Sequence, residues 1–144
     1  MTKAKECLRE MISILRKEDP KSFTEILKTG EGMVLGVKYG PDNLIMQFVE
    51  DDIIVFELSN SSLETSFRCS VEPWMFFDLL EGRVTLADAI WSRALDMIAD
   101  VSNLLRAYRI MELALTSIRG SPAYTKTLLK LKNSSLVEQV ARVV

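Results

Sequence analysis

The sequence contains no histidine in 144 residues, and it has only two cysteines, Cys7 and Cys69. Without histidine, the commonest general base, the Ser–His and Cys–His nucleophile pairs and imidazole metal ligands are all excluded. Two thiols so far apart match no zinc-binding spacing and form no disulfide framework. We therefore expect no catalytic site, no metal site and no cofactor, and we interpret both cysteines as small apolar core residues in a reducing compartment.

The sequence also lacks a large excess of charge of one sign, and it lacks long apolar runs. The chain has 18 Lys and Arg against 20 Asp and Glu, a net charge of -2, and no basic stripe with interleaved aromatic residues. Nucleic-acid binding is therefore not expected. No apolar run approaches the ~20 residues that a membrane span needs, and charges recur through the N-terminal segment, unlike a signal peptide. We predict a cytoplasmic protein with a single domain over residues 1–144.

Two helical patterns open the chain, and four strand-like runs follow them. Residues 3–17 carry an apolar stripe at helical spacing, and Asp19-Pro20 indicates the start of a second helix that ends at Gly30. Runs at 32–39, 44–49, 53–58 and 63–70 alternate apolar and polar side chains between turn signals. Short turns between alternating strands favour an antiparallel meander with one buried face.

Helical spacing returns after residue 72. Pro73 can open a helix, Thr85 can cap a short one, and residues 93–98 alternate like a fifth strand. Asp100 or Ser102 then caps a long helix to about residue 117, before a break at Gly120 and a helical tail. The predicted fold is α+β, with a five-stranded, mostly antiparallel sheet and helices packed on one face.

The segment Asp78–Ala89 reads D-L-L-E-G-R-V-T-L-A-D-A, and a strand, Asp100 and Leu104-Leu105 follow it. This order resembles the sterol carrier protein type 2 family, which has D-L-L-x-G-x-[LV]-x-x-x-x-A, a strand, and an acidic residue opening a leucine-rich helix. The resemblance covers about residues 20–117 and leaves 121–144 as an extra helical tail. Arg93 and Ala99 stand where the family often has glycine, which puts the sharp turns around the fifth strand in doubt.

The resemblance implies an apolar cavity between the sheet and the helices, which binds a sterol, fatty acid, acyl-CoA or isoprenoid lipid without chemistry. The side chains expected on the inward faces of the strands and helices are the candidates for its lining. They are Leu35, Val37, Phe48, Phe56, Phe67, Trp74, Phe77, Leu80, Ile90, Met97, Leu104, Leu105, Tyr108 and Met111. The same pattern also fits a solid core, as in a protein-interaction domain or an accessory subunit of a lipid-metabolism complex.

The tail segment 125–132 is basic and amphipathic, with lysines interleaved among leucines. Such a segment suits transient contact with a membrane surface. Two other roles stay open, a lid over the mouth of the cavity and a packing surface in a homodimer.

Overall fold

The computed structural model describes residues 3–57 and 65–143, with side chains as far as residue 134. Its N-terminal half contains α1 (Lys3–Glu18), α2 (Pro20–Thr29), β1 (Val34–Tyr39), β2 (Asp42–Phe48), β3 (Ile53–Glu57) and β4 (Phe67–Val71). Its C-terminal half contains α3 (Pro73–Leu80), α4 (Leu86–Trp91), β5 (Leu95–Ile98), α5 (Val101–Arg119), the 3-10 turn η1 (Pro122–Tyr124) and α6 (Thr125–Val143).

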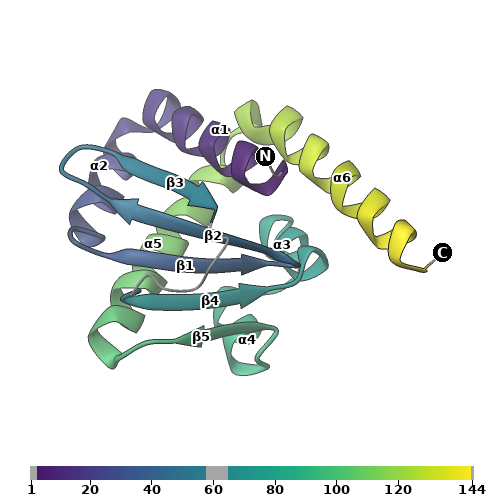
Figure 1. The fold of residues 1–144 in the computed structure, drawn as a ribbon. Coiled ribbons are helices and arrows are strands. Elements are labelled where there is room, and N and C mark those ends of the chain that lie inside the picture. The colour runs from purple at the N-terminus through teal and green to yellow at the C-terminus, as the bar shows by residue number, and fades with distance from the viewer. Residues whose placement is uncertain (1–2, 58–64, 144) are drawn as a thin grey trace.

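The five strands form one sheet in the order β3-β2-β1-β4-β5. Three neighbouring pairs are antiparallel, and only β1 and β4 run parallel. Helix α5 crosses behind the strands, and α3 and α4 lie at one end of the sheet (Figure 1). The predicted α+β fold with a mostly antiparallel sheet is confirmed.

The order of the first four strands differs from the predicted meander. β4 pairs with β1 rather than with β3, with Leu35 opposite Phe67 and Val37 opposite Cys69. Alternation and turn residues identify strands, but they do not identify which strands pair over long range. The turn signal between the predicted strands at 53–58 and 63–70 lies outside the described residues.

The inward faces of β1 and β2 are those predicted from alternation. Leu35 and Tyr39 in β1, and Leu44 and Phe48 in β2, are buried. The expectation that Phe56 of β3 faces inward is wrong, because every position from 53 to 56 is apolar and alternation cannot choose a face. Its pairing with β2 places Val55 opposite Met46 on the helix side, and Phe56 opposite Ile45 on the other face.

Arg93, between α4 and β5, has a backbone φ of 63°, and no other residue besides glycine in the described segments has a positive φ. The sharp turn that suits glycine is thus retained without glycine. A side chain in the left-handed conformation costs about 1–2 kcal/mol. Ala99, at the other end of β5, is not in this conformation, so its turn does not require glycine.

We expect the substitution Arg93→Gly to raise the free energy of unfolding by about 1 kcal/mol, because it removes the steric cost of a Cβ at positive φ. Arg93→Ala is the matched control, since alanine keeps the Cβ while losing the rest of the side chain. Urea denaturation measures both changes. Equal stabilities of the glycine and alanine variants would contradict the argument.

The tail consists of the η1 turn and the continuous helix α6, and its first part belongs to the core. Tyr124 and Leu131 are almost fully buried, and the Thr127 hydroxyl donates a 2.9 Å hydrogen bond to Glu10 Oε2 of α1. The C-terminal part of α6 extends away from the sheet (Figure 1). No helix in the described part of the chain is long and apolar enough to cross a membrane.

Candidate functional site

A cavity of about 240 Å³ lies between the inner face of the sheet and the helices. Side chains from β1, β2, β4 and β5 line one side, including Leu35, Val37, Leu44, Phe67 and Leu95. Helices α1, α3, α4, α5 and α6 line the other, including Met11, Phe76, Leu86, Ile110 and Leu131. Among the described lining residues, only the Tyr39 hydroxyl and two thiols can donate hydrogen bonds from side chains, so the wall suits an apolar ligand.

The space exists because two helices present small side chains to it. On α5, Ala107 and Ala114 are seven residues apart and so share one helix face. On α1, Ala4 and Cys7 occupy the corresponding positions ahead of Met11. Larger residues on these faces would fill the interior at the usual packing density of a core.

Both cysteines line this cavity from opposite sides, Cys7 on α1 and Cys69 on β4. Neither forms a disulfide. Burial raises the pKa of each thiol to about 12, helped by the negative charge of Glu10 for Cys7 and of Asp96 for Cys69. At neutral pH both are therefore uncharged thiols, which are poor nucleophiles and poor metal ligands. The described residues contain no group of three His, Cys, Asp or Glu positioned to hold a metal ion.

The candidates predicted from the sequence divide into three groups. Leu35, Val37, Phe67, Leu80 and Met111 lie in the cavity wall. A second group is buried or half-buried in the core without being in that wall, and it consists of Phe48, Phe77, Ile90, Met97, Leu104 and Tyr108. A third group points away from the cavity and consists of Phe56, Trp74 and Leu105.

Phe48 shows why an inward side chain need not reach the cavity. Its ring packs against Gly30, the residue that ends α2, so closely that a Cβ on Gly30 would lie 2.5 Å from Phe48 Cδ2. Phe48 therefore joins α2 to the sheet beside the cavity. Phe77 likewise faces α6, where Lys132 Nζ lies 5.7 Å from its ring centroid.

Trp74 and Leu105 are 58% and 67% exposed, which corrects the expectation that they face inward. Helix α3 reads PWMFFDLL and is apolar almost throughout, so helical spacing cannot choose its buried face. Phe76 of this helix lies in the cavity wall instead. On α5 the buried stripe runs through Ala107 and Ile110, which leaves Leu105 on the outer side.

Sequence reasoning missed the contributions of α1 and α6. The stripe on residues 3–17 predicted a helix, but the family resemblance began near residue 20 and gave no reason to place α1 in the site. Leu131, which lines the cavity, lies in the tail that was treated as an addition. Leu131 and Thr127 are buried while Leu129 is exposed, so one side of segment 125–132 packs against α1 and α3, and Leu131 reaches the cavity wall.

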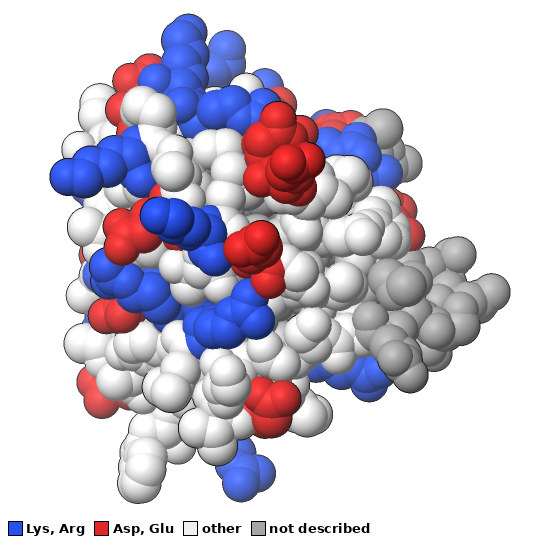
Figure 2. All heavy atoms as spheres, turned by 90° about the vertical axis from the view of Figure 1, so that its left-hand side faces the viewer, with Lys and Arg blue, Asp and Glu red and all other residues white. Residues whose placement is uncertain are grey.

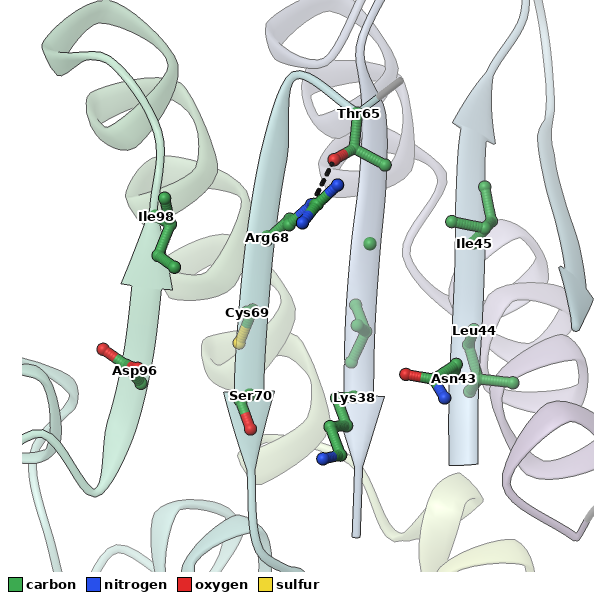
Figure 3. Close-up of a pocket in the computed structure, with 12 residues that line it drawn as sticks. Lys38, Asn43, Leu44, Ile45, Thr65, Arg68, Cys69, Ser70, Asp96 and Ile98 are labelled. Atoms are coloured by element: carbon green, nitrogen blue, oxygen red, sulfur yellow. Dashed lines mark hydrogen bonds between the residues drawn. The ribbon is translucent and has the colours of Figure 1, made fainter. Parts of the chain in front are cut away.

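A second hollow of about 260 Å³ lies on the opposite, outer face of the sheet (Figure 3). Polar side chains from four strands surround it, with Lys38 on β1, Asn43 on β2, Arg68 on β4 and Asp96 on β5. Arg68 Nε donates a 3.2 Å hydrogen bond to the Thr65 hydroxyl at the edge of this hollow. Charged side chains of both signs lie around this hollow, and its lining also includes apolar side chains such as Ile45 and Ile98.

Charges of both signs also alternate on the molecular surface. On the face shown in Figure 2, Lys and Arg lie among Asp and Glu, and no large area carries one sign. Ion pairs join neighbouring elements, as in the 3.0 Å contact between Arg109 of α5 and Glu25 of α2. The single-sign stripe of a nucleic-acid binder is not present on this face.

No protein-family model and no curated protein matches the sequence. Several solved structures match the fold. A sterol carrier protein 2 is 11% identical, with a TM-score of 0.59, over 83% of this chain and 98% of that one. A UbiJ-SCP2 ubiquinone synthesis protein is 17% identical, with a TM-score of 0.56, over 79% and 92%. The sterol carrier protein domain 2 of Helicoverpa armigera is 13% identical, with a TM-score of 0.55, over 80% and 90%.

Proposed function

We propose that this chain, which has the fold of sterol carrier protein 2, binds a hydrophobic small molecule in the central cavity. The observation that carries the proposal is the cavity of about 240 Å³ and its almost wholly apolar wall. An empty apolar space inside a domain loses packing energy that a ligand can restore. The fold supports the proposal, because the similar structures are described as sterol carrier proteins.

The size of the cavity favours a narrow ligand. Its volume, about 240 Å³, exceeds the ~150 Å³ of an engineered cavity that takes up benzene, and it is below the ~300–1,000 Å³ of pockets for drug-sized ligands. One acyl or prenyl chain of a ligand therefore fits this cavity better than the fused rings of a sterol.

Binding is expected to be moderate in strength. Burial of about twelve methylene groups contributes about 10 kcal/mol, at about 0.8 kcal/mol each, and association costs at least about 4 kcal/mol. The remaining ~6 kcal/mol corresponds to a Kd of tens of micromolar. Such an affinity allows both uptake and release of the ligand.

The proposal includes no chemistry on the ligand. The chain has no histidine, and the two thiols in the cavity wall are uncharged at neutral pH because burial raises the pKa of each. Neutral buried thiols suit a reducing compartment, so we place the protein in the cytoplasm. Its role is therefore to hold or carry the ligand.

A titration with a fluorescent fatty acid tests this function. We expect saturable uptake with a Kd of about 10–100 µM, and competition by unlabelled fatty acid, because both occupy one apolar site. Fluorescence that rises without saturation, or that no competitor reduces, would show that the probe does not enter a defined site.

A second candidate is an accessory domain that binds a protein partner. Four large apolar side chains are exposed around α4, β5 and the start of α5, namely Trp91, Ile98, Val101 and Leu105. Val101 and Leu105 are four residues apart and so share one face of α5, and exposed apolar side chains that lie together are typical of interaction surfaces. One similar structure is described as a ubiquinone synthesis protein. The same titration separates the candidates, because a domain with only this role takes up no probe.

A homodimer or membrane contact through the tail stays a prediction.

A further inference from the structure

A groove of about 530 Å³ lies where the ends of α3 and α5 meet η1 and the start of α6. Leu80 of α3 and Ile118 of α5 line both this groove and the central cavity. The two hollows therefore share a wall of two apolar side chains. A shift of these side chains would join the cavity to the surface through the groove.

The groove combines apolar walls with charged groups at its edge. Phe77, Pro122 and Leu128 are in the walls, and Leu129 is more than half exposed beside them. The described lining contains three charged side chains, which are Glu81, Arg119 and Lys132. With two cations and one carboxylate, the lining carries a net positive charge.

An ion pair crosses the groove between α6 and α3. Lys132 Nζ donates to Glu81 Oε1 at 3.1 Å, while the other oxygen of Glu81 contacts Arg83 Nη2 at 2.8 Å. Glu81 is thus shared by two cations, and it keeps a partner in Arg83 when Lys132 moves away. The hydrogen bond from Lys132 is also the main reason that the pKa of Glu81 lies below its usual value.

Arg119 has a fixed position at the same edge. Its Nε donates to the backbone oxygen of Leu79 at 3.1 Å, and its Nη2 donates to the same oxygen. The guanidinium therefore stays beside the end of α3, close to the wall between groove and cavity.

We propose that this groove is a second part of the ligand site, which holds the anionic end of a single-chain amphiphile whose apolar chain occupies the central cavity. The anionic group takes the place of Glu81 as the partner of Lys132. This inference rests on the proposed function. It follows from the shared wall of Leu80 and Ile118, from the net positive lining, and from a cavity too small for a whole amphiphile.

The test compares two probes of equal chain length, hexadecanoic acid and hexadecanol, in displacement titrations. We expect the acid to bind about fivefold more tightly than the alcohol to the unaltered chain, the size of effect that a partly exposed ion pair gives. In Lys132→Met this preference disappears. In Glu81→Gln it increases by about the same factor, because the competing carboxylate is gone. Lys130→Met, two residues away and outside the groove lining, leaves it unchanged.

The ratio of the two affinities protects the test from effects on folding, because a damaged cavity weakens acid and alcohol together. Saturable binding of both probes with an equal preference in all four proteins overturns the groove proposal and leaves the proposed function intact. The groove proposal is also overturned if Lys130→Met loses the preference for the acid as strongly as Lys132→Met does. The preference would then come from the net charge of the protein rather than from Lys132. Failure of both probes to bind the unaltered chain overturns the proposed function and this inference together.

Discussion

Replacing Ala114 with phenylalanine is expected to weaken binding of a fluorescent fatty acid at least tenfold while leaving the fold intact. Ala114 lies on the cavity side of α5, where its small side chain leaves the space open. A phenyl ring placed there occupies the volume that the ligand would use. Filling a cavity commonly adds about 0.5–2 kcal/mol of stability, so a lower affinity would not reflect unfolding. Displacement titration measures the affinity, and urea denaturation measures the stability.

Ala87→Phe is the matched control for this substitution. Ala87 lies on α4 and is exposed, and it is not in the cavity wall. The same change there adds the same ring to the surface and should leave the affinity unchanged. A stable Ala114→Phe protein that binds the probe as tightly as the Ala87→Phe protein would place the ligand elsewhere.

The free energy of unfolding is expected to fall steeply as the pH rises from about 9 to about 12, and Cys69 carries part of this loss. Burial raises the pKa of its thiol from 9.0 to about 12 in the folded chain. Between these values the unfolded chain has released the proton and the folded chain still holds it, so rising pH favours unfolding. Each buried thiol then contributes a loss of about 1.4 kcal/mol per pH unit, and Cys7, with a pKa also raised to about 12, adds to the effect.

The variant Cys69→Ala isolates this contribution, because all lysines and tyrosines still titrate in it. Urea denaturation at pH 8, 9, 10 and 11 should show a shallower decline for the variant than for the unaltered chain. Parallel curves for the two proteins would mean that Cys69 ionises in the folded state as easily as in the unfolded chain. Its thiol would then be open to solvent rather than buried in the cavity wall.

The sequence predicts those features in which apolar and polar residues alternate clearly. β1 places Leu35 and Val37 on the helix side and Lys38 on the other, and the structure agrees. Asp19 caps α2, and its side chain accepts a hydrogen bond from the Ser22 backbone N–H, as the Asp-Pro signal indicates. These features depend on neighbours in the chain, so local patterns suffice to predict them.

The features that the sequence does not predict depend on long-range packing. In α3 and β3 apolar residues occupy both faces, so the buried face is chosen by the elements that pack against it. The parallel pairing of β1 with β4 joins strands that are not consecutive in the chain, so no local pattern records it. The cavity itself arises where short side chains such as Ala4 and Ala114 line the interior, and periodicity records apolar character rather than volume.

Native mass spectrometry of the gently purified protein tests the central claim most directly, because it detects a bound ligand without any choice of probe. We predict a population heavier than the 16.3 kDa chain by the mass of one lipid, which denaturation releases and solvent extraction recovers. In Ala114→Phe this heavier population should disappear. A single species at the mass of the chain, with no lipid in the extract, would contradict the claim that the cavity holds a hydrophobic ligand.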